Sequence, residues 1–322
     1  MLRPLKGLFG KGQGSTVEEP QVSPAKTEAV WSIGIYTGDS PFHWVSHESI
    51  NNPVLTRDDV KDVPAAFVAD PFLLFAHNTL YMFFEVKNRR TNKGEIALAT
   101  SEDGLQWSYR QIVLAEPFHL SYPYVFQWGN DYYMTPESFR AESVRLYKAT
   151  KFPTQWSFIG TLLCGQPFVD PSVFHYQGKV WLFVGTSPAA KHDTLRLFYA
   201  EELLGPWLEH PKSPIINGNA RQARPGGRIL VFDDRIIRYA QDCYPVYGTQ
   251  VRAFEITELT TTAYQEREVS ETPILKANGS GWNASGMHHI DPHPLGDGRW
   301  LACVDGWSRV EISTGAVASD LA

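Results

Sequence analysis

Five widely separated residues each stand directly before a proline and mark a repeating local pattern. Each is polar or aromatic, and in most cases an apolar stretch follows the proline. Three are aspartates, and cleavage of a glycosidic bond needs two carboxyl groups, one to donate a proton and one to attack or to activate water. The pattern therefore places candidate carboxyl groups at fixed points of a repeat. The five are Asp70, Tyr122, Asp170, Arg224 and Asp291.

Two glutamates stand 15 residues after the first two of these positions. Glu85 and Glu137 each end an apolar stretch, and either could serve as a proton donor if aromatic packing raises its pKa. The alternative is a structural role, with hydrogen bonds to turns or ion pairs with Arg90 and Arg140. Ion-pair networks commonly imitate functional sites, so both interpretations stay open.

Two arginines flank a Pro-Gly-Gly turn. The glycines after Arg224 allow close approach of a ligand to the backbone, and the planar guanidinium groups of Arg221 and Arg224 suit bidentate capture of a phosphate or carboxylate. A sugar phosphate or an acidic sugar would fit. The alternative is a buried ion pair of Arg224 with Asp70 or Asp291.

The segment from His288 to His293 is dense in polar side chains. On a strand, His288 and His289 point to opposite faces, so His289 and Asp291 are the expected pair on the ligand side. Histidine and aspartate at this spacing could hold a metal ion, but we predict no metal site and no cofactor. Gln241 and Asp242 end another apolar stretch and are candidates for hydrogen bonds to a sugar.

These residues belong to a repeat of short strands. The five pre-proline positions lie 52, 48, 54 and 67 residues apart, an interval that suits four short strands per propeller blade. Each pre-proline position begins one unit of the repeat, in which turn residues lead from the first strand into a second. Four of the five units continue with a third strand of alternating apolar and polar residues. The repeat predicts an all-β, five-bladed β-propeller, with a β-sandwich as the alternative. In a propeller all five positions would face one axial pocket. The second-strand segments read LYMFFE, YYMTPE, VWLFVG, IIRYAQ and RWLACVD.

The fifth unit ends early, shortly after Asp305-Gly-Trp. The segment from Trp31 to Trp44 resembles the third and fourth strands of the third unit. We therefore expect residues 31–44 to pair with residues 298–307, so that the N-terminal strands close the last blade. Closure leaves only short, protected edges.

Composition, net charge and cysteine content limit the kinds of protein and partner that fit this sequence. Residues 1–28 are rich in Gly, Ser, Pro and charge and predict a flexible tail, while residues 29–322 predict a single domain. A net charge of −6 argues against a nucleic-acid partner. No stretch approaches the ~20 apolar residues of a transmembrane segment. Three cysteines without metal spacing and a poor signal sequence predict a cytoplasmic protein; protein partners cannot be named.

The motifs resemble known families. Asn52-Pro-Val-Leu, Ala69-Asp70-Pro and Val169-Asp170-Pro-Ser-Val-Phe resemble glycoside hydrolase family 43 and its five-bladed relatives. The longer pattern, over residues 31–307, is closer to the N-terminal domain of plant glucosamine inositolphosphorylceramide transferases and their bacterial homologues. The resemblance to family 43 implies that Asp70 is the general base and that Asp170 tunes the pKa of the acid and orients the sugar. Arg224 stands where that family has its proton donor, a departure from ordinary glycoside hydrolysis.

Two functions follow from these patterns. The first is a carbohydrate-active enzyme, by glycosyl transfer or glycoside cleavage, whose sugar ligand carries a phosphate or another acidic group. The second is a non-catalytic sugar-recognition module with a degenerate site. A purely structural platform is disfavoured, since pairing charges around a dry axis is costly. The catalytic candidates are Asp70, Asp170, Glu137 and Glu85, and the binding candidates are Tyr122, Arg221, Arg224, Gln241, Asp242, His289 and Asp291.

Overall fold

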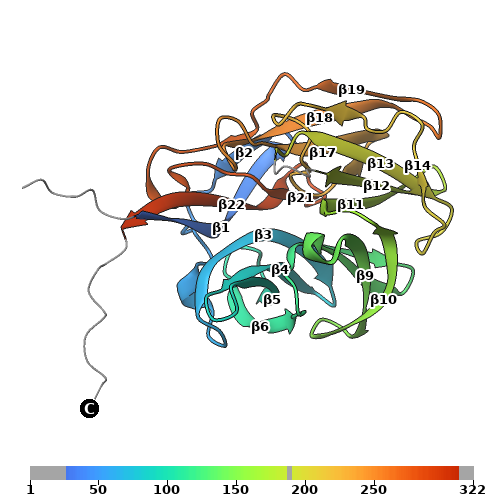
Figure 1. Ribbon diagram of the computed structural model, residues 1–322. Helices are drawn as coiled ribbons and strands as arrows, with labels where there is room; N and C mark the ends of the chain where they lie inside the picture. Colours follow the sequence, from blue (N-terminus) through green and yellow to red (C-terminus); the bar gives the residue numbers. More distant parts are fainter. Residues whose placement is uncertain (1–26, 187–190, 312–322) are drawn as a thin grey trace, which may run out of the picture. The chain divides into compact units, whose positions relative to one another are not determined.

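The computed structural model describes residues 27–186 and 191–311, and these residues form an all-β structure. Five sheets of four or five antiparallel strands make the five blades of a β-propeller (Figure 1). Both the fold class and the number of blades predicted from the repeat are confirmed. The helical elements in the described part of the chain are short 3₁₀ turns: η1 (Arg57–Asp59), η2 (Phe139–Ala141) and η3 (Gly281–Asn283).

Four blades follow one another along the chain. The first contains β3 (Ala65–Ala76), β4 (Thr79–Asn88), β5 (Lys93–Ser101) and β6 (Ser108–Leu114). The second contains β7 (Ser121–Trp128), β8 (Asp131–Glu137), β9 (Ser143–Lys151) and β10 (Gln155–Cys164). The third contains β11 (Phe168–Tyr176), β12 (Lys179–Thr186), β13 (Thr194–Ala200), β14 (Leu208–Glu209) and β15 (Ile216–Asn217). The fourth contains β16 (Leu230–Phe232), β17 (Arg235–Asp242), β18 (Gln250–Leu259), β19 (Tyr264–Glu268) and β20 (Leu275–Lys276).

Tight turns join the first two strands of three blades. At His77-Asn78 and Asp233-Asp234 both residues have positive φ, and Gln177-Gly178 has the same geometry. Two consecutive residues with positive φ define the two-residue hairpin turn that matches the natural twist of paired strands, and Asn, Asp and Gly tolerate this geometry best. The turn dipeptides of the sequence therefore set the register of the innermost hairpins.

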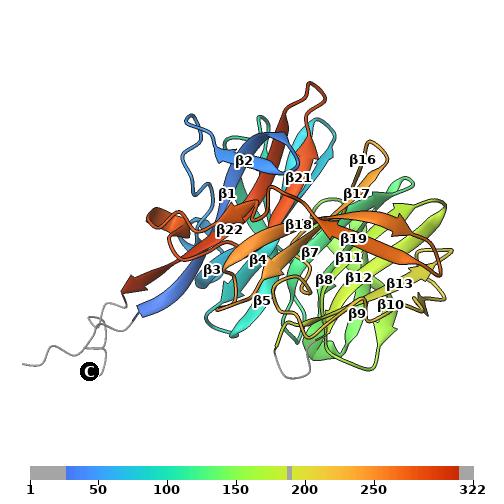
Figure 2. The same cartoon turned by 90° about the horizontal axis from the view of Figure 1, so that it is seen from above.

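The last blade contains both ends of the described chain. Its strand order is β2-β1-β22-β21, formed by β1 (Thr27–Ser40), β2 (His43–Ser46), β21 (Ile290–Pro294) and β22 (Trp300–Glu311). Blue β1 and red β22 run side by side in both views (Figures 1 and 2). The predicted closure of the ring by the N-terminal strands is confirmed. Ile33 and Ile35 of β1 are 0% exposed and pack in a cluster with residues of the first blade.

Residues Ala29–Val310 form one compact unit that contains all five blades. The predicted flexible tail, residues 1–28, lies outside the described residues except for Thr27 and Glu28, which begin β1. Within the described ranges, no helix has the length and apolar character needed to cross a bilayer. The three cysteines are free thiols.

Candidate active site

Local distortions of three innermost strands position the central side chains. Asp70, Tyr122 and Asp170 have φ values of 53°, 45° and 51°, and a register shift occurs at each of them against the second strand of the blade. A β-bulge of this kind bends the strand and redirects a side chain. Positive φ is costly for residues other than glycine and concentrates at functional sites. The same distortion in three blades therefore marks this end of the strands as a candidate site.

Arg224 joins the second, third and fourth blades at the centre. Its Nε donates to Asp170 (2.5 Å) and its Nη2 donates to Glu137 (3.2 Å). Gln241 donates from its side-chain amide to the same Asp170 carboxylate (2.8 Å). Arg224 is 9% exposed, so the interaction is a buried ion pair. Of the two interpretations of Arg224, the structure supports the buried Arg–Asp pair, with Asp170 as the partner in place of Asp70 or Asp291.

Glu137 is held by several donors. Besides Arg224, it accepts hydrogen bonds from the Ser121 hydroxyl and from the backbone N–H of Asp170, both at 3.2 Å. Burial raises the pKa of Glu137 well above its usual value, and the nearby Asp170 carboxylate adds to this effect. Each oxygen of Glu137 thus has a partner, but its cationic partner is Arg224 rather than Arg90 or Arg140.

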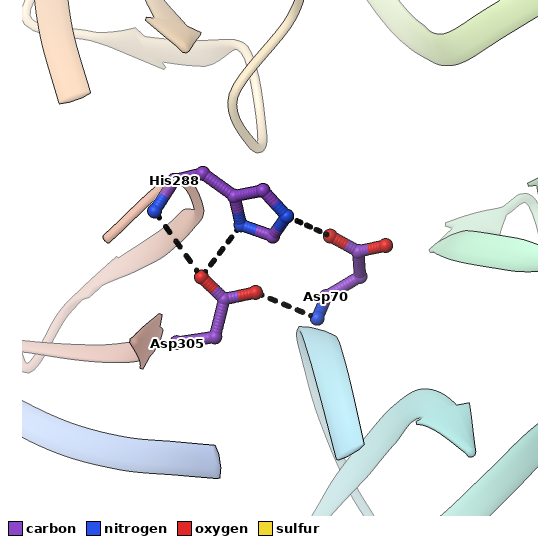
Figure 3. A group of neighbouring side chains, drawn as sticks. All are labelled: Asp70, His288 and Asp305. Atoms are coloured by element: carbon purple, nitrogen blue, oxygen red, sulfur yellow. Dashed lines mark hydrogen bonds and ion pairs between the residues drawn. The ribbon is translucent and has the colours of Figure 1, made fainter. Parts of the chain in front are cut away.

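Asp70, His288 and Asp305 form a second group at the centre (Figure 3). The Nδ1 atom of His288 donates to Asp305 (2.7 Å), and the Nε2 atom faces Asp70 Oδ1 at 3.7 Å. The backbone N–H of Asp70 donates to the other oxygen of Asp305 (2.9 Å). Asp305 therefore fixes both the histidine ring and the strand that carries Asp70.

Burial and mutual charge set the proton affinities of this group. Burial raises the pKa of Asp70 to about 7, although His288 opposes the shift. For His288, burial disfavours the charged ring, but Asp305 and Asp70 together raise the pKa of His288. Burial likewise disfavours a charged Asp305, but His288, His289 and the hydrogen bond from the backbone of Asp70 together lower the pKa of Asp305. His288 and Asp305 are therefore a buried ion pair beside a carboxyl group that gains or loses its proton near neutral pH.

The same three residues could share a metal ion. One ligand atom from each of Asp70, His288 and Asp305 lies within 4.8 Å of the others. The direct hydrogen bond between His288 and Asp305 already satisfies that pair. The absence of a metal site therefore stays a prediction from the sequence.

Aromatic rings pack against the two cationic side chains of the centre, His288 and Arg224. Trp31 of β1 stacks on the His288 ring, with ring centroids 4.0 Å apart and planes inclined by 26°. Tyr247, from the loop between β17 and β18, meets His288 edge-on at 5.1 Å and lies 5.1 Å from the Arg224 guanidinium carbon. Tyr247 is 38% exposed, whereas Asp70 is 6% exposed. The group around Arg224 (with Asp170, Glu137 and Gln241) and the group of Asp70, His288 and Asp305 together are called the central cluster. The Tyr247 ring therefore lies between the central cluster and solvent.

Glu85 lies at the edge of this cluster. It pairs across the strands with Ala69, the residue before Asp70. Burial raises the pKa of Glu85 well above its usual value, and Asp70 adds to the shift. Its Oε1 atom has no hydrogen-bond partner among the described residues, with His119 Nε2 at 3.4 Å. Glu85 is therefore better placed than Glu137 to hold an available proton.

Tyr122 contributes to the centre mainly through its backbone. Its N–H donates to Asp70 (3.2 Å), which helps to orient that carboxyl group. Its buried phenol bonds Ser172 (2.9 Å) and the carbonyl of Gly227 (2.8 Å). The side chain of Tyr122 thus ties three innermost segments together.

Asp291 lies outside this cluster, contrary to the expectation that all five pre-proline residues would meet. Its strand β21 pairs with β22 without any register shift, so it lacks the bulge that redirects Asp70. Asp291 instead binds Arg228 (2.5 Å) and His293 (3.0 Å), and Arg228 lowers the pKa of this buried carboxyl group. His289 and Asp291 do not hydrogen-bond each other in the described structure: His289 donates from Nε2 to the carbonyl of Pro71 (2.8 Å), and its Nδ1 lies 4.0 Å from Asp70 Oδ1.

Two further binding candidates lie away from the centre. Arg221 donates to Asp242 (3.3 Å), and Arg252 donates to the same carboxylate (2.9 Å). The structure therefore places Arg221 and Asp242 in an ion-pair network of the fourth blade. Gln241, one residue earlier on β17, is the member of that strand that reaches the centre.

Asp305, His288 and Trp31 lie at the centre but are not among the site residues predicted from the sequence. Asp305 stands 14 residues after Asp291, much as Glu85 stands 15 after Asp70, so counting along the fifth unit could have found it. A regular strand would turn His288 away from the ligand side, yet its ring faces Asp70. No sequence signal pointed to Trp31, whose ring reaches the centre because β1 closes the last blade.

Solved structures of other proteins share this fold. A family 62 α-L-arabinofuranosidase from Coprinopsis cinerea matches with a TM-score of 0.56 and 11% identity, covering 75% of this chain and 91% of that chain. An exo-β-1,3-galactanase from Clostridium thermocellum matches with a TM-score of 0.55 and 14% identity, covering 66% and 51%. At these identities the likeness shows the fold, a five-bladed propeller like that of glycoside hydrolases.

Sequence comparison identifies the family. Residues 24–307 match the family described as glucosamine inositolphosphorylceramide transferase 1, N-terminal, and the chain belongs to this family of carbohydrate-active proteins. Glucosamine inositolphosphorylceramide transferase 1 of Oryza sativa subsp. japonica is 38% identical over 299 residues, covering 87% of this chain and 40% of the relative. The Arabidopsis thaliana protein of the same name is 37% identical over 300 residues, covering 87% and 39%. The chain thus spans about two fifths of the length of these curated relatives.

Proposed function

We propose that this chain is an enzyme that transfers or cleaves a glycosyl group at the central cluster. The observation that carries the proposal is the buried Asp70 carboxyl group, whose pKa is raised to about 7, beside the His288–Asp305 pair. A proton-transfer group works best when its pKa lies near the operating pH. Perturbed carboxyl groups gathered at one end of a fold are also a general mark of catalytic sites.

The residues divide into distinct roles. Asp70 accepts or donates the proton at the reacting oxygen, and His288, held by Asp305, supports its charge in the alternate protonation state. Asp170 is fixed by Arg224 and Gln241, so its role is to position groups around the sugar. Glu85, whose pKa is raised by burial, supplies the second carboxyl group that glycosidic chemistry requires. The partly exposed ring of Tyr247 offers an apolar face for stacking on a sugar.

The names of the curated relatives favour a phosphate-bearing substrate. The curated relatives are named as glucosamine inositolphosphorylceramide transferases, and such names favour glycosyl transfer onto or from a phosphate-bearing molecule. Because this chain spans about two fifths of those proteins, their complete activity is not assigned to it. The cytoplasmic location likewise stays a prediction from the sequence.

One observation favours a sugar-recognition module without catalysis. Arg224 stands where the resembling hydrolases have a proton donor, and its guanidinium group already binds Asp170 and Glu137. A binding module would keep the buried polar cluster to orient a sugar and would need no group free to protonate a leaving oxygen.

Turnover and binding, measured on one ligand panel, separate the two functions. The panel comprises nucleotide sugars, glycosyl phosphates and nitrophenyl glycosides. Asp70→Asn keeps the shape and removes the titrating group, so turnover should fall by about 10²–10⁴-fold. Asp297→Asn, an exposed change, is the matched control. Unchanged turnover in Asp70→Asn would remove this residue from the mechanism, and binding without turnover in the wild type would establish the recognition module.

A further inference from the structure

A cleft of about 630 Å³ lies between the first two blades, apart from the central cluster. Its walls come from the end of β4, the turn between β4 and β5, the segment before β7, and η2. Three cationic residues line it, namely Lys87, Lys93 and Arg140. We call it the basic cleft. Nothing in the candidate mechanism uses these three side chains.

The two lysines of the basic cleft bind backbone carbonyls and not carboxylates. The ammonium groups of Lys87 and Lys93 donate to the backbone carbonyls of Asn92 (2.7 Å) and Glu116 (2.6 Å). The Glu116 carboxylate is engaged elsewhere, because it accepts from the Tyr147 hydroxyl (2.8 Å). Among the residues that the structure describes, no carboxylate forms an ion pair with Lys87, Lys93 or Arg140, and none lines the cleft.

A second cavity of similar size has a different arrangement of charges. The cavity of about 680 Å³ between the fourth and the last blade also contains two arginines. There, Arg235 and Arg267 both bind Glu255, at 2.7 and 2.6 Å. Its positive charges are therefore satisfied within the chain. The basic cleft has the opposite character and would attract an anion.

Aromatic and neutral polar groups complete the walls of the basic cleft. Phe118 and Phe139 line it, and the Arg140 guanidinium carbon lies 5.2 Å from the Phe139 ring centre. The backbone N–H of Gly94 donates to His119 Nδ1 (2.8 Å), so the proton of the neutral ring is on Nε2. Burial, Lys87 and Arg140 lower the pKa of His119 to about 4, which keeps the ring neutral. The cleft therefore combines three cations with flat apolar surfaces.

This combination matches a specific ligand chemistry. Guanidinium and ammonium groups bind phosphate oxygens by charge-assisted hydrogen bonds, and aromatic rings pack on the apolar face of a sugar. We propose that the basic cleft binds a phosphate ester attached to a sugar, with Lys87, Lys93 and Arg140 on the phosphate and Phe118 and Phe139 beside the sugar ring.

The cleft adjoins the central cluster through two residues. His119 lines the cleft and faces Glu85 at 3.4 Å, and Glu85 in turn interacts electrostatically with Asp70. Asp70 raises the pKa of Glu85, whereas Lys87 of the cleft lowers it. A phosphate held here would thus sit next to the candidate proton donor. Binding at the cleft is nevertheless independent of whether the centre turns over a substrate.

The test measures phosphate-ester binding directly. Calorimetric titration compares glucose 1-phosphate with glucose, and the histidine NMR signals report whether His119 responds. The variant Lys87→Gln/Lys93→Gln/Arg140→Gln should bind glucose 1-phosphate at least roughly tenfold more weakly, because several charge-assisted contacts are lost. Lys179→Gln, a lysine of the third blade that pairs with Glu201, is the matched control and should bind as the wild type does.

A second arm distinguishes a soluble ester from a lipid headgroup. Sedimentation with phosphatidylglycerol vesicles, against phosphatidylcholine vesicles, tests a phosphate carried by a lipid. Binding of either phosphate source that is lost in the triple variant supports the cleft. The proposal is overturned if the triple variant, shown by thermal unfolding to be folded, binds as tightly as the wild type. It is also overturned if the wild type binds neither glucose 1-phosphate nor the anionic vesicles.

Discussion

Replacing Arg224 by methionine should destabilise the fold strongly. The substitution keeps much of the length of the side chain but removes the charge between Asp170 and Glu137, whose side chains are 2% and 5% exposed. Removing one partner of a buried ion pair leaves an uncompensated charge and typically costs about 3–5 kcal/mol. We therefore expect the free energy of unfolding to fall by about that amount, measured by urea unfolding with tryptophan fluorescence.

Two further variants isolate the cause. Arg221→Met is the matched control, because the Arg221 side chain is 46% exposed and its partner Asp242 keeps Arg252. Exposed ion pairs contribute about 0–1 kcal/mol, so this variant should be nearly neutral. Adding Asp170→Asn to Arg224→Met removes the carboxyl group that Arg224 binds most closely and should restore part of the loss. Similar unfolding free energies for Arg224→Met and Arg221→Met would refute the argument, as would a double variant less stable than Arg224→Met.

The remaining predictions concern pH and the closing blade. The pKa of Asp70 is about 7 in the folded protein and about 3.9 in an unfolded chain, so its contribution to stability is present below pH 4 and is lost as the pH rises through 7. Asp70→Asn should therefore flatten the unfolding free energy between pH 4 and 7 relative to the wild type, and parallel curves would contradict the assigned shift. Deleting residues 1–45 should abolish cooperative thermal unfolding, whereas deleting residues 1–26 should not, and a cooperatively melting 46–322 fragment would disprove ring closure. Ile35→Ala, at a fully buried position of β1, should cost about 2–5 kcal/mol by the same assay.

The repeat made the propeller predictable from the sequence. Turn dipeptides such as His77-Asn78 encode two-residue hairpins, and their recurrence revealed the units even though the units share few identical residues. The early end of the fifth unit, set against the strand-like segment after Trp31, was enough to predict the closing blade. These signals are local, and local backbone preferences can be read directly from residue types.

The central site was less predictable because its geometry depends on strand register. A shift of one residue turns a side chain to the other face of a sheet, and bulges of this kind carry no clear sequence signal. Asp70 and Asp170 lie on bulges and reach the centre, whereas Asp291 has the same Asp-Pro motif without a bulge and binds Arg228. The carboxylate that pairs with a buried arginine can also lie far away in the sequence, since Arg224 and Asp170 are 54 residues apart.

The stacking of Trp31 on His288 makes the centre depend on the first and the last strands of the chain. Among the strands that the structure describes, β1 is synthesised first and its partner β22, which carries Asp305, is synthesised last. Four blades can form before either His288 or its carboxylate partner exists in the nascent chain. The central cluster can therefore form only once β22 is in place, because Asp305 of β22 accepts the hydrogen bonds from the His288 ring and from the backbone N–H of Asp70.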